Sequence, residues 1–81
     1  MLTIGAKTKL KPGEVVKKAV EFFGPKGYKL TVTEQSADFA SFEGGGGGVS
    51  VTTSIEGKQT SVELTSREWD FQVKEFLGKI K

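Results

Sequence analysis

The feature that most restricts the fold of this chain is a stretch of alternating apolar and polar residues from Tyr28 to Thr65, broken only by short gaps. Alternation with a period of two is typical of strands that bury one face and expose the other. The gaps at 34–36, 44–48 and 56–58 are short, whereas a parallel return needs about a dozen residues. The stretch therefore predicts a four-stranded antiparallel meander.

One further strand and two helices are expected outside this stretch. Residues 2–10 alternate in the same way and predict a first strand. Residues 13–24 place apolar side chains three and four positions apart, which predicts an amphipathic helix. Residues 66–80 repeat this spacing, and Thr65 and Glu68 have the separation of a capping box at the start of that second helix.

The helical spacing also predicts which side chains the helices bury. On the second helix the apolar residues cluster within about a third of a turn, so that helix has one apolar face. The residues expected to be buried on the two helices are Val16, Val20, Phe23, Trp69, Val73, Phe76, Leu77 and Ile80. A hydrophobic core between the helices and the sheet follows from this pattern.

The element order is β-α-β-β-β-β-α in a single domain, residues 1–81, with no linker. Because each helix and each clear strand has one apolar face, we expect a two-layer α+β fold, with a curved antiparallel sheet and both helices on one face. This order resembles one repeat of the TATA-binding-protein fold, and a shortened form of the helix-grip fold of START and pathogenesis-related proteins. The resemblance covers element order alone, so no functional residue is carried over from either family.

The composition argues against most enzymatic chemistry. The chain has no His and no Cys, which removes thiol nucleophiles, disulfides, the usual zinc ligands and the usual base at neutral pH. We therefore expect a protein that is not an enzyme and that has no cofactor and no metal. No apolar run approaches the ~20 residues of a membrane span, and the N-terminus lacks the apolar stretch of a secretion signal. The expected location is cytoplasmic.

Five consecutive glycines at 44–48 could suggest a phosphate-binding loop. Such loops join a strand to a helix, and in the P-loop they end in Lys followed by Ser or Thr. Here the glycines join two predicted strands, and Val49 follows them. We therefore expect a mobile, Gly-rich hairpin loop that binds nothing.

The outward positions of the predicted strands are rich in Ser and Thr and include Lys7, Lys9 and Lys29. These lysines are candidate contacts for phosphate groups, so the sheet face predicts weak nucleic-acid binding. The net charge is only +2 and Arg67 is the single arginine, which disfavours base-specific recognition. The aromatic residues that stack on bases are missing from most of this face, with Phe42 as an exception.

Two phenylalanines are candidates for an exposed contact. Burying Phe42 would also turn Asp38 inward, and a lone buried carboxylate is costly. The pattern therefore favours Phe39 inward and Phe42 outward, unless a bulge places both inside. Phe71 lies about 200° from Trp69 around the second helix, opposite its apolar stripe. Phe42 and Phe71 are thus candidate interface residues for a second copy of the chain.

Three functions are consistent with these patterns. We rank first a small, non-enzymatic interaction module that associates with itself as a homodimer. The second is a weak nucleic-acid-binding domain that uses the Lys, Ser and Thr sheet face. The third is a binder of small apolar ligands between the C-terminal helix and the sheet, by analogy with the helix-grip fold, although a chain of 81 residues leaves little room for a large cavity.

Overall fold

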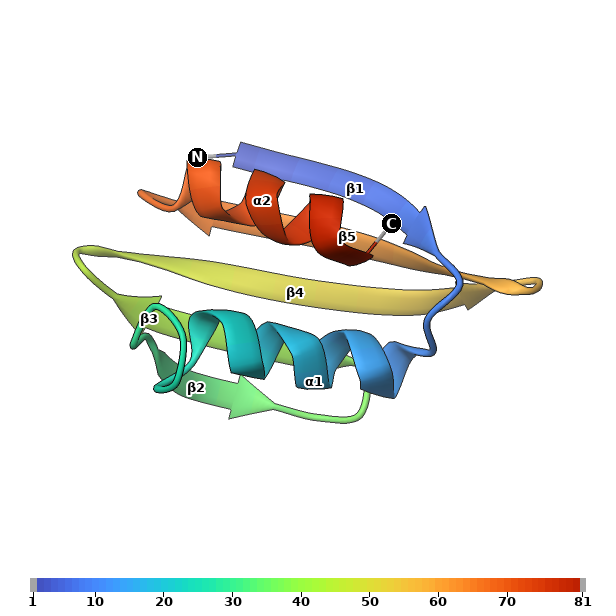
Figure 1. The fold of residues 1–81 in the computed structure, drawn as a ribbon, viewed down its shortest axis with the longest axis horizontal. Coiled ribbons are helices and arrows are strands. Elements are labelled where there is room, and N and C mark those ends of the chain that lie inside the picture. The colour runs from blue at the N-terminus through green and yellow to red at the C-terminus, as the bar shows by residue number, and fades with distance from the viewer. Residues whose placement is uncertain (1, 81) are drawn as a thin grey trace.

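The computed structural model describes residues 2–80 and has a curved, five-stranded antiparallel sheet with two helices (Figure 1). The elements are β1 (Leu2–Thr8), α1 (Pro12–Phe23), β2 (Thr31–Gln35), β3 (Phe39–Gly44), β4 (Gly47–Glu56), β5 (Gln59–Arg67) and α2 (Asp70–Ile80). The expected two-layer α+β fold and its β-α-β-β-β-β-α order are confirmed.

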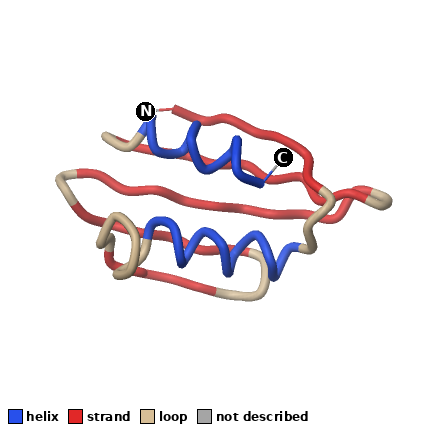
Figure 2. The backbone as a smooth tube through the Cα atoms, viewed as in Figure 1, coloured by secondary structure: helices blue, strands red, loops and turns tan. Residues whose placement is uncertain are grey.

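The strands lie in the order β1-β5-β4-β3-β2, and every neighbouring pair is antiparallel. The segment from β2 to β5 is the expected meander, joined by short turns (Figure 2). The first strand, β1, pairs with the side of β5 that faces away from β4. The two edges of the sheet are therefore β1 and β2. Helix α1 packs over β3 and β4, whereas α2 packs over β1 and β5.

Helix α1 begins where its sequence provides a suitable start. Pro12 occupies the first turn, where its missing N–H removes no helical hydrogen bond. The carboxylate of Glu14 accepts a hydrogen bond of 3.2 Å from the backbone N–H of Lys11. The helix ends before Gly24, whose backbone N–H still donates to the carbonyl of Val20. A Cβ atom at Gly24 would lie 2.3 Å from that same carbonyl oxygen, so only glycine fits this close approach.

The start of α2 differs from the expectation. A capping box of Thr65 and Glu68 was expected, but Thr65 lies in β5 and pairs with Thr3 and Ser50. The alternation of β5 continues through Arg67 because β1 and β4 supply partners on both sides. The helix therefore begins at Asp70, whose carboxylate accepts a hydrogen bond from the Ser66 hydroxyl.

The core lies between the sheet and the two helices. Its buried members are Val15, Val16, Ala19, Phe23, Leu30, Ala40, Phe42, Val49, Val51, Val62, Leu64, Val73, Phe76, Leu77 and Ile80. Six of the eight helix residues expected to be buried are in this set. Val20 and Trp69 are only half-buried, because Val20 lines an open groove and Trp69 precedes α2 instead of lying within it.

The glycine run forms a tighter hairpin than expected. Gly44 is the last residue of β3, and Gly47 and Gly48 already belong to β4. Only Gly45 and Gly46 form the turn, with φ angles of 60° and 82°. Two consecutive residues with positive φ match the hairpin turn whose twist fits that of the flanking strands. The mobility of this hairpin stays a prediction.

Candidate interaction surfaces

The three candidate lysines do not form one patch. Lys7 lies on edge strand β1, and its ammonium group is 3.1 Å from a carboxylate oxygen of Glu56. Lys9 follows β1, whereas Lys29 precedes β2 at the opposite edge of the sheet. Because the width of five strands separates Lys29 from Lys7, these charges are not placed to follow one phosphate backbone together.

The outer face of the sheet carries hydroxyl groups, as the alternation predicted. The strand register places Ser41, Ser50, Thr65 and Thr3 in one row across four strands. The hydroxyl oxygens of Thr3 and Thr65 lie 3.5 Å apart. Such a row is compatible with contacts to a polar partner, but it is equally the ordinary composition of a solvated sheet face.

The expected orientation of strand β3 is wrong. Phe42 is 1% exposed, and its ring centre lies 5.6 Å from that of Phe23. Phe39 is half-buried and its strand position places it on the outer face, opposite Thr52. Phe42 is therefore a core residue, and it is removed from the candidate interface.

The reason lies in where β3 begins. The strand starts at Phe39, so Asp38 sits outside it and is exposed. Its carboxylate accepts a 3.1 Å hydrogen bond from the Ser36 hydroxyl, and its carbonyl accepts from the backbone N–H and the hydroxyl of Thr53. Burying Phe42 thus leaves no carboxylate in the core. The short polar residues Ser36 and Asp38 are turn-forming types that could have indicated this boundary.

Phe71 is 71% exposed and projects from the side of α2 opposite its buried residues. Lys74, Glu75 and Gly78 are also exposed. At about 100° per residue, these four positions form one band that faces away from the core. We call Phe71, Lys74, Glu75 and Gly78 the outer stripe of α2. Gly78 had not been singled out from the sequence, although a glycine inside a helical pattern is a signal for close packing or function.

The two sheet edges differ in how well they are protected. Strand β2 has five residues and a shift in register between Val32 and Glu34, and both features discourage pairing with another strand. Strand β1 has seven residues in unbroken register. Its residues from Leu2 to Ala6 carry no charge. The β1 edge is therefore the more open of the two to a partner strand.

Two aromatic residues, Trp69 and Tyr28, connect the segment that follows α1 with the glycine hairpin and with α2. The indole N–H of Trp69 donates a 3.0 Å hydrogen bond to the carbonyl of Gly44. The rings of Trp69 and Tyr28 lie 5.8 Å apart, centre to centre. The hydroxyl of Tyr28 donates a 2.8 Å hydrogen bond to a carboxylate oxygen of Glu75. This hydrogen bond, with a smaller contribution from desolvation and from the charge of Glu75, raises the pKa of Tyr28 above its ordinary value.

Replacing Glu75 with alanine is expected to lower the pKa of Tyr28 towards its ordinary value of about 10, because both the hydrogen bond and the negative charge are lost. The chain has one tyrosine, so ultraviolet absorbance of the tyrosinate measures this pKa directly. A raised folded-state pKa means that the interaction stabilises the fold fully below pH ~10, and that its contribution is lost as the pH rises through the raised value. Glu21→Ala is the control, and an equal pKa in all three proteins would contradict the assigned contact.

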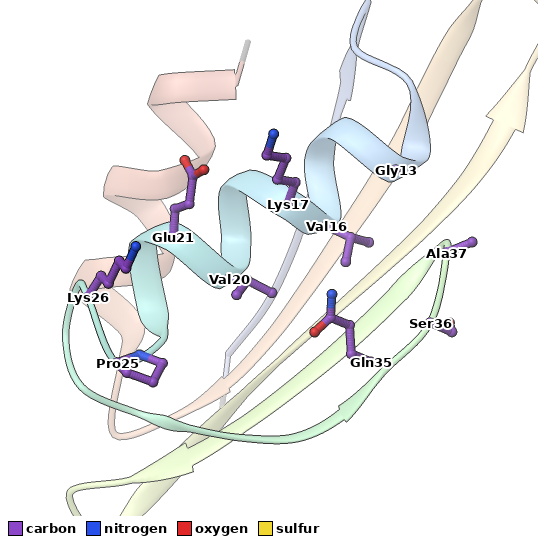
Figure 3. Close-up of a pocket in the computed structure, with 10 residues that line it drawn as sticks. All are labelled: Gly13, Val16, Lys17, Val20, Glu21, Pro25, Lys26, Gln35, Ser36 and Ala37. Atoms are coloured by element: carbon purple, nitrogen blue, oxygen red, sulfur yellow. The ribbon is translucent and has the colours of Figure 1, made fainter.

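An open groove of about 510 Å³ lies between α1 and the end of β2, together with the two residues that follow that strand. Figure 3 shows Val16 and Val20 on the helix, with Gln35, Ser36 and Ala37 on the facing segment. The residues that α2 turns towards the sheet, Val73, Phe76, Leu77 and Ile80, are all buried. Smaller open grooves lie beside α2 and include Phe76 and Ile80, and ligand binding between α2 and the sheet stays a prediction.

The acidic side chains within residues 2–80 do not gather in groups of three or more that could hold a metal ion. Two of these carboxylates have partners within the chain: Glu56 pairs with Lys7, and Asp70 accepts a hydrogen bond from the Ser66 hydroxyl. In the same part of the chain, neither helix has the length and apolar character that crossing a bilayer requires.

Comparison of the chain with protein-family models, curated proteins and solved structures gives no match.

Proposed function

We propose that this protein is a small interaction module without chemistry of its own, and that it associates with itself as a homodimer. The observation that carries the proposal is the exposure of Phe71 on a helix that the core holds firmly. Four buried residues anchor α2 to the sheet, so the phenyl ring of Phe71 is displayed on a rigid element. One exposed phenylalanine is common in folded proteins, but a symmetric partner would cover it on both copies at once.

Replacing Phe71 with alanine is expected to weaken self-association by at least about tenfold, which corresponds to the roughly 1.4 kcal/mol that one buried aromatic side chain readily supplies. Sedimentation equilibrium over a wide range of protein concentration measures this change. Ile55→Ala is a matched control, because Ile55 on β4 is 72% exposed and Phe71 is 71% exposed. Equal association of both variants and the wild type would remove Phe71 from the interface, and a wild type that stays monomeric would refute the proposed function.

We rank weak nucleic-acid binding second. The hydroxyl-rich sheet face supports it, but Lys7 is paired with Glu56 and Lys29 lies at the other edge. Binding of small apolar ligands ranks third, and the groove beside α1 is the surface that would serve it. A cytoplasmic location remains part of the proposal, and a fluorescent fusion to the intact chain would test it.

A further inference from the structure

Gly78 is a helical residue that the isolated chain does not explain. It lies within α2, is exposed, and has an ordinary backbone conformation outside the positive-φ region. A Cβ atom built at Gly78 would meet nothing within 4 Å. Glycine lowers the stability of a helix relative to alanine. Neither its backbone conformation nor a close neighbour within the chain requires a glycine at this position.

The position of Gly78 on α2 links it to the other exposed residues of the outer stripe. Gly78 follows Phe71 by two helical turns, so both lie near the middle of the stripe. Lys74 and Glu75 lie between them, about 50° to either side of that middle line. The stripe therefore has an aromatic residue at one end, a residue without a side chain at the other, and opposite charges on its two flanks.

We infer that two copies of α2 pair side by side in the same direction, about a twofold axis that runs along the helices. This inference rests on the proposed self-association and names its surface and orientation. In this arrangement Phe71 packs against the partner's Phe71, and Gly78 lets the two backbones approach closely. The twofold axis brings the flank with Lys74 against the partner's flank with Glu75, and it does so twice.

The charges decide between the two orientations of a helix pair. In a parallel pair, the residues on one flank of the stripe face the residues on the other flank of the partner's stripe. Flanking charges select the orientation of coiled coils in the same way. An antiparallel pair would instead bring Lys74 beside the partner's Lys74, and Glu75 beside the partner's Glu75. Within residues 2–80, the only ion pair joins Lys7 and Glu56, so Lys74 has no competing carboxylate at ion-pair distance. Glu75 uses one carboxylate oxygen for Tyr28, and its second oxygen can accept from a partner.

Sedimentation equilibrium of the full chain and of charge variants tests the orientation. Lys74→Glu and Glu75→Lys should each weaken the dimer by about tenfold, because each replaces two attractive pairs with two repulsive ones. The double variant Lys74→Glu, Glu75→Lys restores opposite charges across the parallel interface, so its association should return to within about twofold of wild type. Lys17→Glu on α1 is the control for Lys74→Glu, because it makes the same change in net charge outside the stripe. It should leave the association unchanged.

Gly78→Ala provides a second, independent measurement. The substitution should raise the thermal midpoint of the dilute protein and weaken the dimer by several-fold, since it improves the helix but holds the backbones apart. A merely structural glycine would not produce opposite effects on folding and association. Gly78→Ala that leaves association unchanged would overturn the close approach at this position.

The remaining outcomes separate failure of this inference from failure of the proposed function. A double charge variant that stays as weak as the single variants would overturn the parallel orientation. A wild-type dimer that none of the α2 variants alters would overturn the surface but not self-association. Thr3→Lys, which places a charge on the open β1 edge, would then identify the edge as the interface if it abolished the dimer. A wild type that remains monomeric at millimolar concentration would refute both proposals.

Discussion

Replacing Phe76 with alanine is expected to destabilise the fold by about 3–5 kcal/mol. The side chain is 1% exposed, and its ring centre lies 5.4 Å from that of Phe22 and 5.4 Å from that of Phe23. Phe76 therefore joins α2 to α1 as well as to the sheet, and its removal leaves a cavity where the two helices meet. Domains of this size have a free energy of unfolding near 5–15 kcal/mol, so the variant should be largely unfolded in mild denaturant.

Urea denaturation followed by circular dichroism measures this loss, with Phe71→Ala as the control. The control makes the same substitution in the same helix at a position that is 71% exposed. Its free energy of unfolding should stay within about 0.5 kcal/mol of the wild-type value at a concentration where the chain is monomeric. A loss below about 1 kcal/mol for Phe76→Ala would show that the buried face of α2 is assigned to the wrong side.

The periodicity of the sequence was sufficient to predict the elements and the layer arrangement. Alternation between Tyr28 and Thr65 predicted antiparallel strands because short turns permit no other connection. Helical spacing placed Val73, Phe76 and Ile80 in the core, and all three are buried. The same angular argument placed Phe71 on the opposite side of the helix, where it is exposed. These features depend on local patterns that survive in the folded chain.

The expected start of α2 is wrong because a distant segment changed a local pattern. Thr65 and Glu68 have capping-box spacing, but β1 pairs with β5 along Leu2–Thr8 and extends that strand through Arg67. The residues near Thr65 in the sequence do not indicate that a strand from the start of the chain pairs with this segment. Phe42 was misplaced for a different reason: the expected strand began two residues too early, which forced Asp38 into it. Element ends are the least reliable part of a pattern, and the orientation of a short strand depends on them.

The candidate surface was only partly predictable for the same reason. The strand order is a property of the whole fold, so the sequence could not show that Lys7 and Lys29 lie at opposite edges. The outer stripe of α2 is local, and Phe71 was found because its helical angle requires no distant contact. Gly78 carries a sequence signal as a glycine inside a helical pattern, and the structure adds that the space around it is open.

Replacing Gly47 with alanine is expected to destabilise the fold by about 3 kcal/mol or more, the upper end for forcing atoms into a packed site. Gly47 is buried at the start of β4. A Cβ atom there would lie 1.9 Å from the carbonyl oxygen of Arg67 and 2.7 Å from the Cβ atom of Glu68. The first of these neighbours is backbone, so relief requires β5 and the segment leading into α2 to move away from the hairpin.

Two other glycines show that this cost comes from the close approach and not from the loss of glycine itself. Gly46 has a φ of 82° and nothing within 4 Å of a built Cβ atom, so Gly46→Ala should cost only the backbone strain of about 1–2 kcal/mol. Gly78 has neither strain nor a neighbour, so Gly78→Ala should stabilise the monomer by up to about 1 kcal/mol. Chemical denaturation of the three variants at low protein concentration should therefore rank them Gly78→Ala, Gly46→Ala, Gly47→Ala from most to least stable. If Gly47→Ala were as stable as Gly46→Ala, the end of β5 would not be held against the hairpin at Gly47.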